Sequence, residues 1–202
     1  MKNITIKRAP LTFLKEYHKV PIQFSADIIY PEELFVGKAE DINLVETPVP
    51  RFTKDYDEYE LPYKWVEKWD ISNWCILKAE IDDQYVAGAV IAYNTNGVNM
   101  LEGRDDIAVL WDIRVSPDHR GKGIGEKLFK EAVKFAEEKN CNFLKIETQN
   151  INVNACKFYK KMGCYLGKYS IREYKDLSDE IMMMWYYRIK DESLTKPQRH
   201  GE

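Results

Sequence analysis

The sequence predicts an α/β fold with a mixed central sheet, and two observations lead to this prediction. Residues 107–115 are apolar at nearly every position, as in a strand that helices cover on both faces. They are followed by an amphipathic helix pattern over 122–139 and a short strand pattern over 143–148. A strand–helix–strand unit implies that its two strands lie parallel. The other strand patterns favour antiparallel neighbours on the flanks.

Hydrophobic periodicity and turn residues predict the other elements. The elements expected before residue 107 are a strand at 2–8, short helices at 11–18 and 62–69, and a hairpin of strands 74–81 and 85–93, followed by a loop over 94–105. Those expected after residue 148 are helix 152–162, which Gly163 ends, and strands 164–170 and 181–189. The stretch 24–60 contains Pro31, Pro48 and Pro50 and has no clear period, so no element is assigned to it.

Length and composition favour a soluble globular protein. The 202 residues predict one domain, expected over 1–190, with a flexible tail over 191–202. The net charge of −3 gives no reason to expect nucleic acid as a partner. No apolar run approaches the roughly 20 residues of a membrane span, and the N-terminus lacks the apolar core of a signal peptide. A cytoplasmic protein without a membrane partner is expected, either a monomer or a homodimer.

The cysteines do not form a recognisable metal-binding pattern. No two of them are spaced C-x-x-C, and the chain has only three histidines, so no metal site is predicted. We expect small buried thiols at the four positions, which are Cys75, Cys141, Cys156 and Cys164.

Alternation along 107–115 predicts two faces for this strand. One is expected to carry Ile107, Val109, Trp111, Ile113 and Val115, and the other Ala108 and Leu110. Asp112 is a carboxylate inside this otherwise apolar strand. A buried carboxylate needs hydrogen-bond partners, so Asp112 has either a structural role or a role in contacting a substrate.

A glycine-rich loop, SPDHRGKGIG over residues 116–125, joins the apolar strand to the helix. Glycines let successive backbone N–H groups turn toward one point, and a helix N-terminus adds free N–H groups and partial positive charge. Such a loop suits a pyrophosphate. Glu126 replaces the last glycine of a dinucleotide fingerprint, and no G-K-[ST] ends the loop as in a Walker A motif.

Two motifs together resemble those of the GNAT superfamily of N-acetyltransferases. Arg120-x-x-Gly123-x-Gly125, which runs into an amphipathic helix, resembles the acetyl-CoA loop of that superfamily, and N-x-x-A-x-x-F-Y-x-x-x-G over 152–163 resembles its second signature. Residues 147–163 and 44–54 are similar to the streptothricin acetyltransferases in particular. The resemblance implies the GNAT fold, with about six to seven strands, a sheet splayed after strand 107–115, and helices on both faces. It places the acetyl-CoA-binding core at about residues 74–165.

The resemblance also implies how the chain would hold acetyl-CoA. Loop amides would bind the pyrophosphate, and the pantetheine arm would pair with strand 107–115 as an extra strand. The implied cofactor-binding residues are Ile113, Arg114, Val115, Arg120, Gly121, Lys122, Gly123, Ile124, Gly125, Asn152 and Ala155. From the residues alone, Ile113 and Val115 also fit a core, and Asn152 fits an N-cap.

Acetyl transfer to an amine needs a base, because a lysine-like amine of pKa near 10.4 is neutral in roughly one molecule in 2,500 at pH 7. Glu147 lies at the place where similar superfamily members carry their base, although it also fits a solvent-facing carboxylate. Asp112 is the second candidate base, and either residue could act through water. For Tyr159 the resemblance implies a general acid that protonates the leaving thiol.

The acidic run Asp55, Asp57, Glu58 and Glu60 fits either a solvated face or a rim that attracts a polycation. The predicted function is acetyl-CoA-dependent acetylation of a primary amine, on a cationic antibiotic such as streptothricin. Two alternatives stay open. One is a peptide or protein N-acetyltransferase, and the other is a non-catalytic sensor that binds acyl-CoA.

Overall fold

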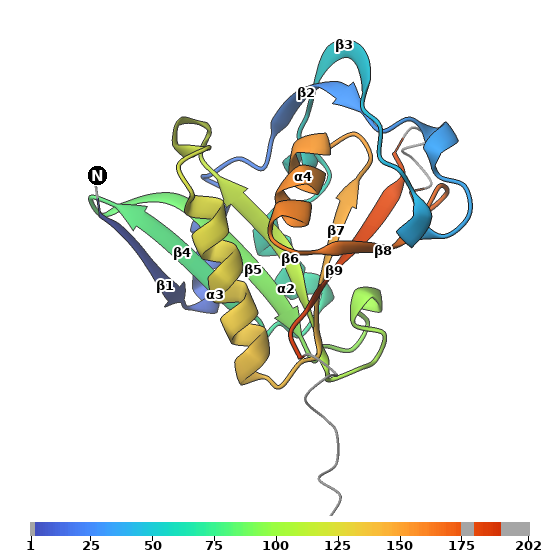
Figure 1. Cartoon of the computed structure of the whole chain (residues 1–202). Coiled ribbons are helices and arrows are strands. Elements are labelled where there is room, and N and C mark those ends of the chain that lie inside the picture. Colours follow the sequence, from blue (N-terminus) through green and yellow to red (C-terminus); the bar gives the residue numbers. More distant parts are fainter. Residues whose placement is uncertain (1–2, 175–179, 191–202) are drawn as a thin grey trace, which may run out of the picture.

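The computed structural model describes residues 3–174 and 180–190, and in this part of the chain a seven-stranded mixed sheet forms the centre (Figure 1). The strand order is β1-β4-β5-β6-β7-β9-β8. The strands are β1 (Ile4–Ala9), β4 (Cys75–Ile81), β5 (Gln84–Tyr93), β6 (Ile107–Val115), β7 (Phe143–Gln149), β8 (Tyr165–Ser170) and β9 (Met182–Arg188). β6 and β7 pair in parallel, as the strand–helix–strand pattern predicts. The predicted tail over 191–202 lies outside the described residues.

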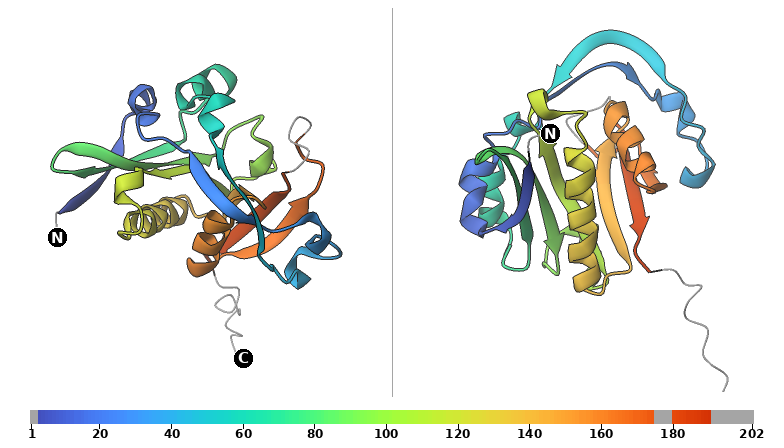
Figure 2. Two further views of the ribbon diagram at one scale, coloured as in Figure 1. Left: turned by 90° about the horizontal axis from the view of Figure 1, so that it is seen from above. Right: turned by 60° about the vertical axis from the view of Figure 1, so that its left-hand side comes forward.

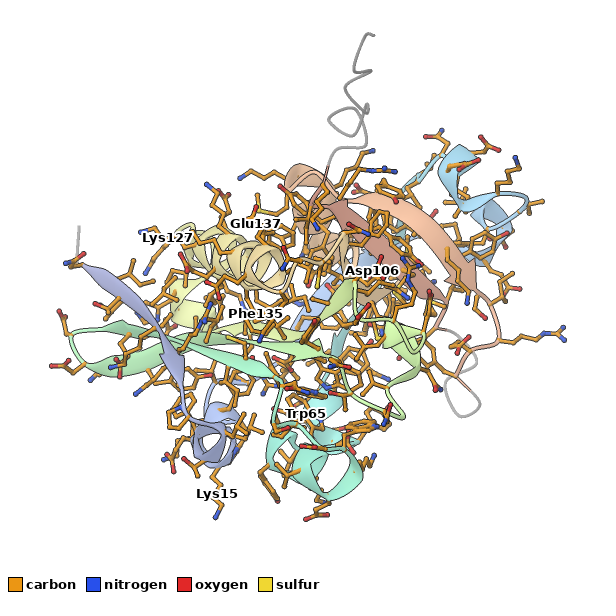
Figure 3. All side chains as sticks on the ribbon, turned by 90° about the horizontal axis from the view of Figure 1, so that it is seen from below. Lys15, Trp65, Asp106, Lys127, Phe135 and Glu137 are labelled. Atoms are coloured by element: carbon orange, nitrogen blue, oxygen red, sulfur yellow. The ribbon has the colours of Figure 1, made fainter. Side chains whose placement is uncertain are left out.

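Helices cover both faces of the sheet (Figures 1 and 2). α3 (Ile124–Glu138) and α4 (Val153–Lys161) lie on one face, and the short helices α1 (Leu14–Tyr17) and α2 (Trp65–Lys68) lie on the other. Figure 3 shows Phe135 between α3 and the sheet, with Lys127 and Glu137 on the solvent side. This arrangement confirms the amphipathic pattern. Gly163, in a left-handed conformation, follows α4.

Short 3-10 helices connect several of these elements. They are η1 (Leu11–Phe13), η2 (Glu32–Leu34), η3 (Ala39–Asp41), η4 (Tyr56–Glu58), η5 (Pro62–Lys64), η6 (Asn99–Leu101) and η7 (Pro117–His119). The four cysteines are buried, as predicted. No helix in the described ranges has the length and apolar character needed to cross a bilayer.

β6 contains a bulge that the alternation pattern does not predict. Val90 of β5 pairs with Asp112, but the next residue, Ile91, pairs with Leu110. Trp111 is therefore an extra residue with no partner in β5. A bulge of this kind moves the side chains that follow it to the opposite face of the sheet.

The reversal corrects the predicted faces of this strand. Ile113 and Val115 do not share a face with Ile107, Val109 and Trp111, but pack against the core under α3. Asp112 and Arg114 turn instead to the face that carries α1, where Tyr17 contacts both.

β6 and β7 separate at one end of the sheet (Figure 1). Their parallel register runs from the pair Ile107–Phe143 to the pair Leu110–Ile146 and ends there. β6 continues along β5 as far as Val115. The sheet therefore opens after Leu110, inside the strand, and not after Val115 as expected.

The unassigned stretch 24–60 contains a second, two-stranded antiparallel sheet. β2 (Phe24–Ile29) and β3 (Thr47–Lys54) form this ribbon, which arches over the end where β6 and β7 separate (Figure 2). Two hydrogen bonds hold the two ends of β2. Arg120 Nη2 donates to the carbonyl of Gln23 at 2.7 Å, and the Tyr30 amide donates to the carbonyl of Asn150 at 3.1 Å.

Candidate active site

A cleft of about 790 Å³ lies between the separated ends of β6 and β7. The loop over 116–123, the first turn of α3 and one face of α4 form one side of it, and residues near the arch form the other. All of the site residues predicted from the sequence line this cleft except Lys122. The Lys122 ammonium instead donates to the carbonyl of Asp118 at 2.7 Å.

The glycine-rich loop leaves β6 and turns directly into α3. Gly121 and Gly123 both have left-handed backbones, with φ of 74° and 77°, which favour glycine because other L residues are strained there. A Cβ atom at either position would meet no other atom within 4 Å, so the backbone is open to a ligand. The free amides at the start of α3 add the partial positive charge of a helix N-terminus.

Arg120 braces this loop. Its guanidinium donates to the carbonyl of Val115 at 3.0 Å as well as to Gln23. Burial lowers the pKa of Arg120, although an arginine stays charged at neutral pH. The loop, the end of β6 and the arch are thus held together by one side chain.

Residues 111–115 of β6 present one free edge to the cleft. Asp112 to Val115 pair with β5 on one side, and no described strand pairs with their other side, because the pairing with β7 ends at Leu110. Backbone amides and carbonyls on such an edge can pair with an extended ligand.

Asp112 and Arg114 form a buried ion pair on the α1 side of β6. Asp112 Oδ1 accepts from the Tyr17 hydroxyl at 2.7 Å and from Arg114 Nε at 2.9 Å. Arg114 Nη1 also donates to Asp57 at 2.9 Å. Burial alone would lower the pKa of Arg114, but the charge and hydrogen bonds of Asp112, together with Tyr17 and Asp57, outweigh it and raise that pKa. Asp112 has the hydrogen-bond partners that a structural role requires and also lines the cleft, so its role as second candidate base stays a prediction. Arg114 offers its backbone, not its guanidinium, to the free edge.

Glu147 of β7 lies directly beyond the last pair with β6 and faces the cleft. Its Oε1 accepts from the Tyr174 hydroxyl at 2.7 Å. Burial raises the pKa of Glu147, and the Tyr174 hydrogen bond opposes that rise. A carboxylate with a raised pKa is a stronger base than an exposed one.

Tyr159 and Asn152 reach the cleft from α4. Tyr159 is 5% exposed, and its hydroxyl has no hydrogen-bond partner among the described residues. Burial raises the pKa of Tyr159 well above its ordinary value, so the hydroxyl keeps its proton at neutral pH. Asn152 is the N-cap of α4, because its Oδ1 accepts from the Ala155 amide at 3.2 Å, and its amide nitrogen stays available to a ligand.

The other side of the cleft is an aromatic wall, which consists of Tyr56, Tyr59, Trp65 and Trp111. The Trp65 and Trp111 rings meet edge to face at 6.2 Å, and the Tyr56 and Tyr59 rings lie 6.4 Å apart. The carboxylates of Asp57, Glu60 and Glu147 also line the cleft. This wall was not predicted from the sequence.

The acidic run is neither a uniform solvated face nor four free charges. Asp55 caps η4 by accepting from the Asp57 amide, and Asp57 itself is paired with Arg114. Glu58 is exposed, and Glu60 is paired with Lys68 on the cleft side. Only Asp57 and Glu60 of the run line the cleft.

Comparison with known proteins agrees with this geometry. The model of the acetyltransferase (GNAT) family matches residues 38–164. The chain belongs to this family. It is an acetyl-CoA-dependent N-acetyltransferase, close to the streptothricin acetyltransferases.

Two curated relatives are similar to this GNAT enzyme over most of their length. Streptothricin acetyltransferase A of Bacillus subtilis (strain 168) is 28% identical over 81% of this chain and 94% of its own length. Streptothricin acetyltransferase of Escherichia coli is 28% identical over 83% of this chain and 92% of its own length.

Solved structures share the fold. A Bacillus anthracis str. Ames protein, proposed to be a streptothricin acetyltransferase and solved with acetyl coenzyme A, is 28% identical, with a TM-score of 0.72 over 94% of this chain and 99% of that one. Nourseothricin acetyltransferase has a TM-score of 0.70 at 23% identity, over 93% of this chain and 99% of that one.

The residues of this GNAT enzyme fit acetyl-CoA. The open glycine backbone suits a pyrophosphate, the free edge of β6 suits the two amides of a pantetheine arm, and the unpartnered Tyr159 hydroxyl lies in the same cleft. The described residues contain no cluster of three or more His, Cys, Asp or Glu that could hold a metal ion.

Several lining residues were not predicted from the sequence. Tyr56 and Tyr59 lie within the acidic run of residues 55–60. This mixture of tyrosines and carboxylates was the local feature from which an aromatic, acidic surface could have been predicted. Trp65 of α2 and Gln149 of β7 come from separate elements, and no local pattern connects them.

We expect Gly123→Ala to weaken acetyl-CoA binding about tenfold, because a left-handed alanine costs roughly 1–2 kcal/mol and its methyl group would stand over the loop amides. Gly103→Ala is the matched control, since Gly103 also has a positive φ (68°) and open space around it but lies outside the cleft. Calorimetric titration with acetyl-CoA should show a weaker Kd for Gly123→Ala alone. Equal affinities in both variants would contradict the assignment of the loop.

Proposed function

We propose that this enzyme acetylates a primary amine of a cationic small molecule, and that streptothricin is such a substrate. The observation that carries the proposal is the aromatic wall, which lines the same cleft as the glycine-rich loop and the carboxylate of Glu147. Aromatic faces attract cations, and carboxylates in a cleft raise the local concentration of a cationic ligand. The names of the two curated relatives support streptothricin as the first compound to test.

The loop side of the cleft would bind the donor. Acetyl-CoA supplies the acetyl group as a thioester when it is bound. The backbone amides of residues 121–125 would hold its pyrophosphate, while the free edge at Ile113 and Val115 and the amide of Asn152 would align its pantetheine arm. A backbone N–H on this edge would also polarise the carbonyl of the acetyl group.

Glu147 would be the general base. Its raised pKa makes it a better proton acceptor than an exposed glutamate, and it lines the cleft together with the glycine-rich loop and the aromatic wall. The amine proton would pass to Glu147, directly or through a water molecule, and the neutral amine would then attack.

Tyr159 would be the general acid. Its buried hydroxyl is protonated at neutral pH and has no competing partner among the described residues, so its proton is free for the leaving sulfur. A thiol has a pKa near 8.5 and leaves with little assistance, so the contribution of Tyr159 is expected to be smaller than that of Glu147.

A panel of amines tests the proposed substrate class. Thiol release from acetyl-CoA is measured with streptothricin, spermidine, lysine, and peptides with a free N-terminal alanine or an internal lysine. We expect kcat/KM for streptothricin to exceed that of each peptide at least about 100-fold, and KM to rise with salt because screening shortens the Debye length. Release with peptides alone would indicate a peptide N-acetyltransferase. Acetyl-CoA binding with no release on any amine would indicate a sensor.

Glu147→Gln should lower kcat/KM for the best amine about 100-fold or more at pH 7, the ordinary size of general-base catalysis. Because the pKa of Glu147 is raised, the base form is lost at a higher pH than for an ordinary glutamate. In the native enzyme, kcat/KM should fall more steeply with decreasing pH once the pH drops below the pKa of Glu147. In Glu147→Gln, the plot of log kcat/KM against pH should keep one slope, because the base that titrates is gone. Glu46→Gln, outside the cleft, serves as control. Superimposable profiles would remove the base role.

Tyr159→Phe should lower kcat about tenfold and leave the acetyl-CoA Kd unchanged, because only the proton donor is lost. Tyr187→Phe is the matched control. Both rings pack against Phe129, at centroid distances of 6.3 and 5.5 Å, but only Tyr159 lines the cleft. Unchanged kcat in Tyr159→Phe would assign this tyrosine to the core.

A further inference from the structure

A hydrogen-bonded chain begins at Glu147 and links it to two other lining residues, Gln149 and Tyr56. The Tyr174 hydroxyl donates to Glu147 Oε1 at 2.7 Å and accepts from Gln149 Nε2 at 2.9 Å. The Tyr56 hydroxyl lies 2.8 Å from both Gln149 Oε1 and Glu180 Oε2. Lys54 pairs with Glu180 at 2.6 Å. The chain joins β7, the segment after β8, and η4 beneath the arch.

The direction of each bond near Glu147 is set by its partners. A tyrosine hydroxyl has one proton to donate, and Tyr174 directs it at Glu147 because Gln149 fills its acceptor position with an N–H. The ionised Glu147 carboxylate has no proton and can only accept, so the Tyr174 hydroxyl is the donor in their bond. Tyr174 therefore has a donor on one side and the carboxylate on the other.

Few other groups act on the Glu147 carboxylate. Among the described residues, Tyr174 is the hydrogen-bond donor to it. The Lys145 ammonium attracts it from a distance but is bound to Glu102 at 2.7 Å, and the nearby Glu173 repels it. Glu180, farther along the chain, is neutralised by Lys54.

We infer that Tyr174 is a positioning residue for Glu147, which holds the carboxylate through Oε1 in the orientation that leaves Oε2 toward the cleft, and which stabilises its ionised form. The inference rests on the proposed role of Glu147 as the base. No catalytic contact is assigned to Tyr174 itself, because Tyr174 does not line the cleft.

The direction of the effect follows from the donor. A hydrogen bond given to a carboxylate favours the charged form, so Tyr174 counteracts the burial that raises the pKa of Glu147. Without the hydroxyl, that pKa rises further. Less of the enzyme then has an ionised base at neutral pH, and the acid limb of activity moves to higher pH.

The test compares Tyr174→Phe with the native enzyme and with Tyr169→Phe. Tyr169 also has one hydroxyl bond, to the carbonyl of Gly37 at 2.9 Å, and lies outside the cleft. In Tyr174→Phe, the pH below which kcat/KM falls more steeply should be higher by about one pH unit. At a pH below that point, kcat/KM should be about tenfold lower than in the native enzyme. Acetyl-CoA Kd should not change. Tyr169→Phe should keep the native profile.

Carbon NMR of isotope-labelled glutamate carboxyls, with Glu147→Gln to assign the signal, measures the pKa of Glu147 without turnover. A higher pKa in Tyr174→Phe supports the inference even if the base role fails. A native pKa together with a native pH profile in Tyr174→Phe would overturn it. If Glu147→Gln retains the native activity and profile, the proposed base is wrong, and the NMR titration alone decides the role of Tyr174.

Discussion

Trp111 is an extra residue in β6, because Val90 and Ile91 of β5 pair with Asp112 and Leu110 on either side of it. At this point β6 turns away from β7 and continues along β5. A bulge bends its strand and increases the local twist. The free edge, the cleft and the access of α4 to it all follow from this separation. The same bulge places Ile113 in the core under α3 and turns Arg114 to the opposite face.

The buried Arg114 guanidinium, which pairs with both Asp112 and Asp57, connects β6 with η4. Buried ion pairs often contribute little net stability, because desolvation offsets their attraction, but removing one partner leaves a costly buried charge. The Arg114 backbone forms part of the free edge, and its guanidinium pairs with Asp57, which is next to Tyr56 of the aromatic wall. The ion pair of Arg114 and Asp57 therefore holds η4, with Tyr56, against the edge where the donor would lie.

The segments with a clear hydrophobic period were predictable from the sequence. Where the structure differs from the predicted elements, the difference has a physical cause. Strand 107–115 matches β6 at both ends, because a buried strand has a continuous apolar signal. The bulge at Trp111 leaves no trace in such a signal, since either register keeps apolar side chains buried. The stretch 24–60 had no period because β3 contains Pro48 and Pro50, and β2 shifts register between Ala26 and Ile28.

The two sides of the cleft differ in how much local sequence specifies them. The loop side depends on left-handed glycines and one helix start, which must be contiguous, so residues 116–125 could be identified as a motif. The opposite side combines Tyr56, Trp65, Trp111 and Glu147 from four different elements. Such a surface exists only after folding. Donor chemistry could therefore be predicted from sequence alone, whereas the acceptor must be inferred from the charges and rings that the fold brings together.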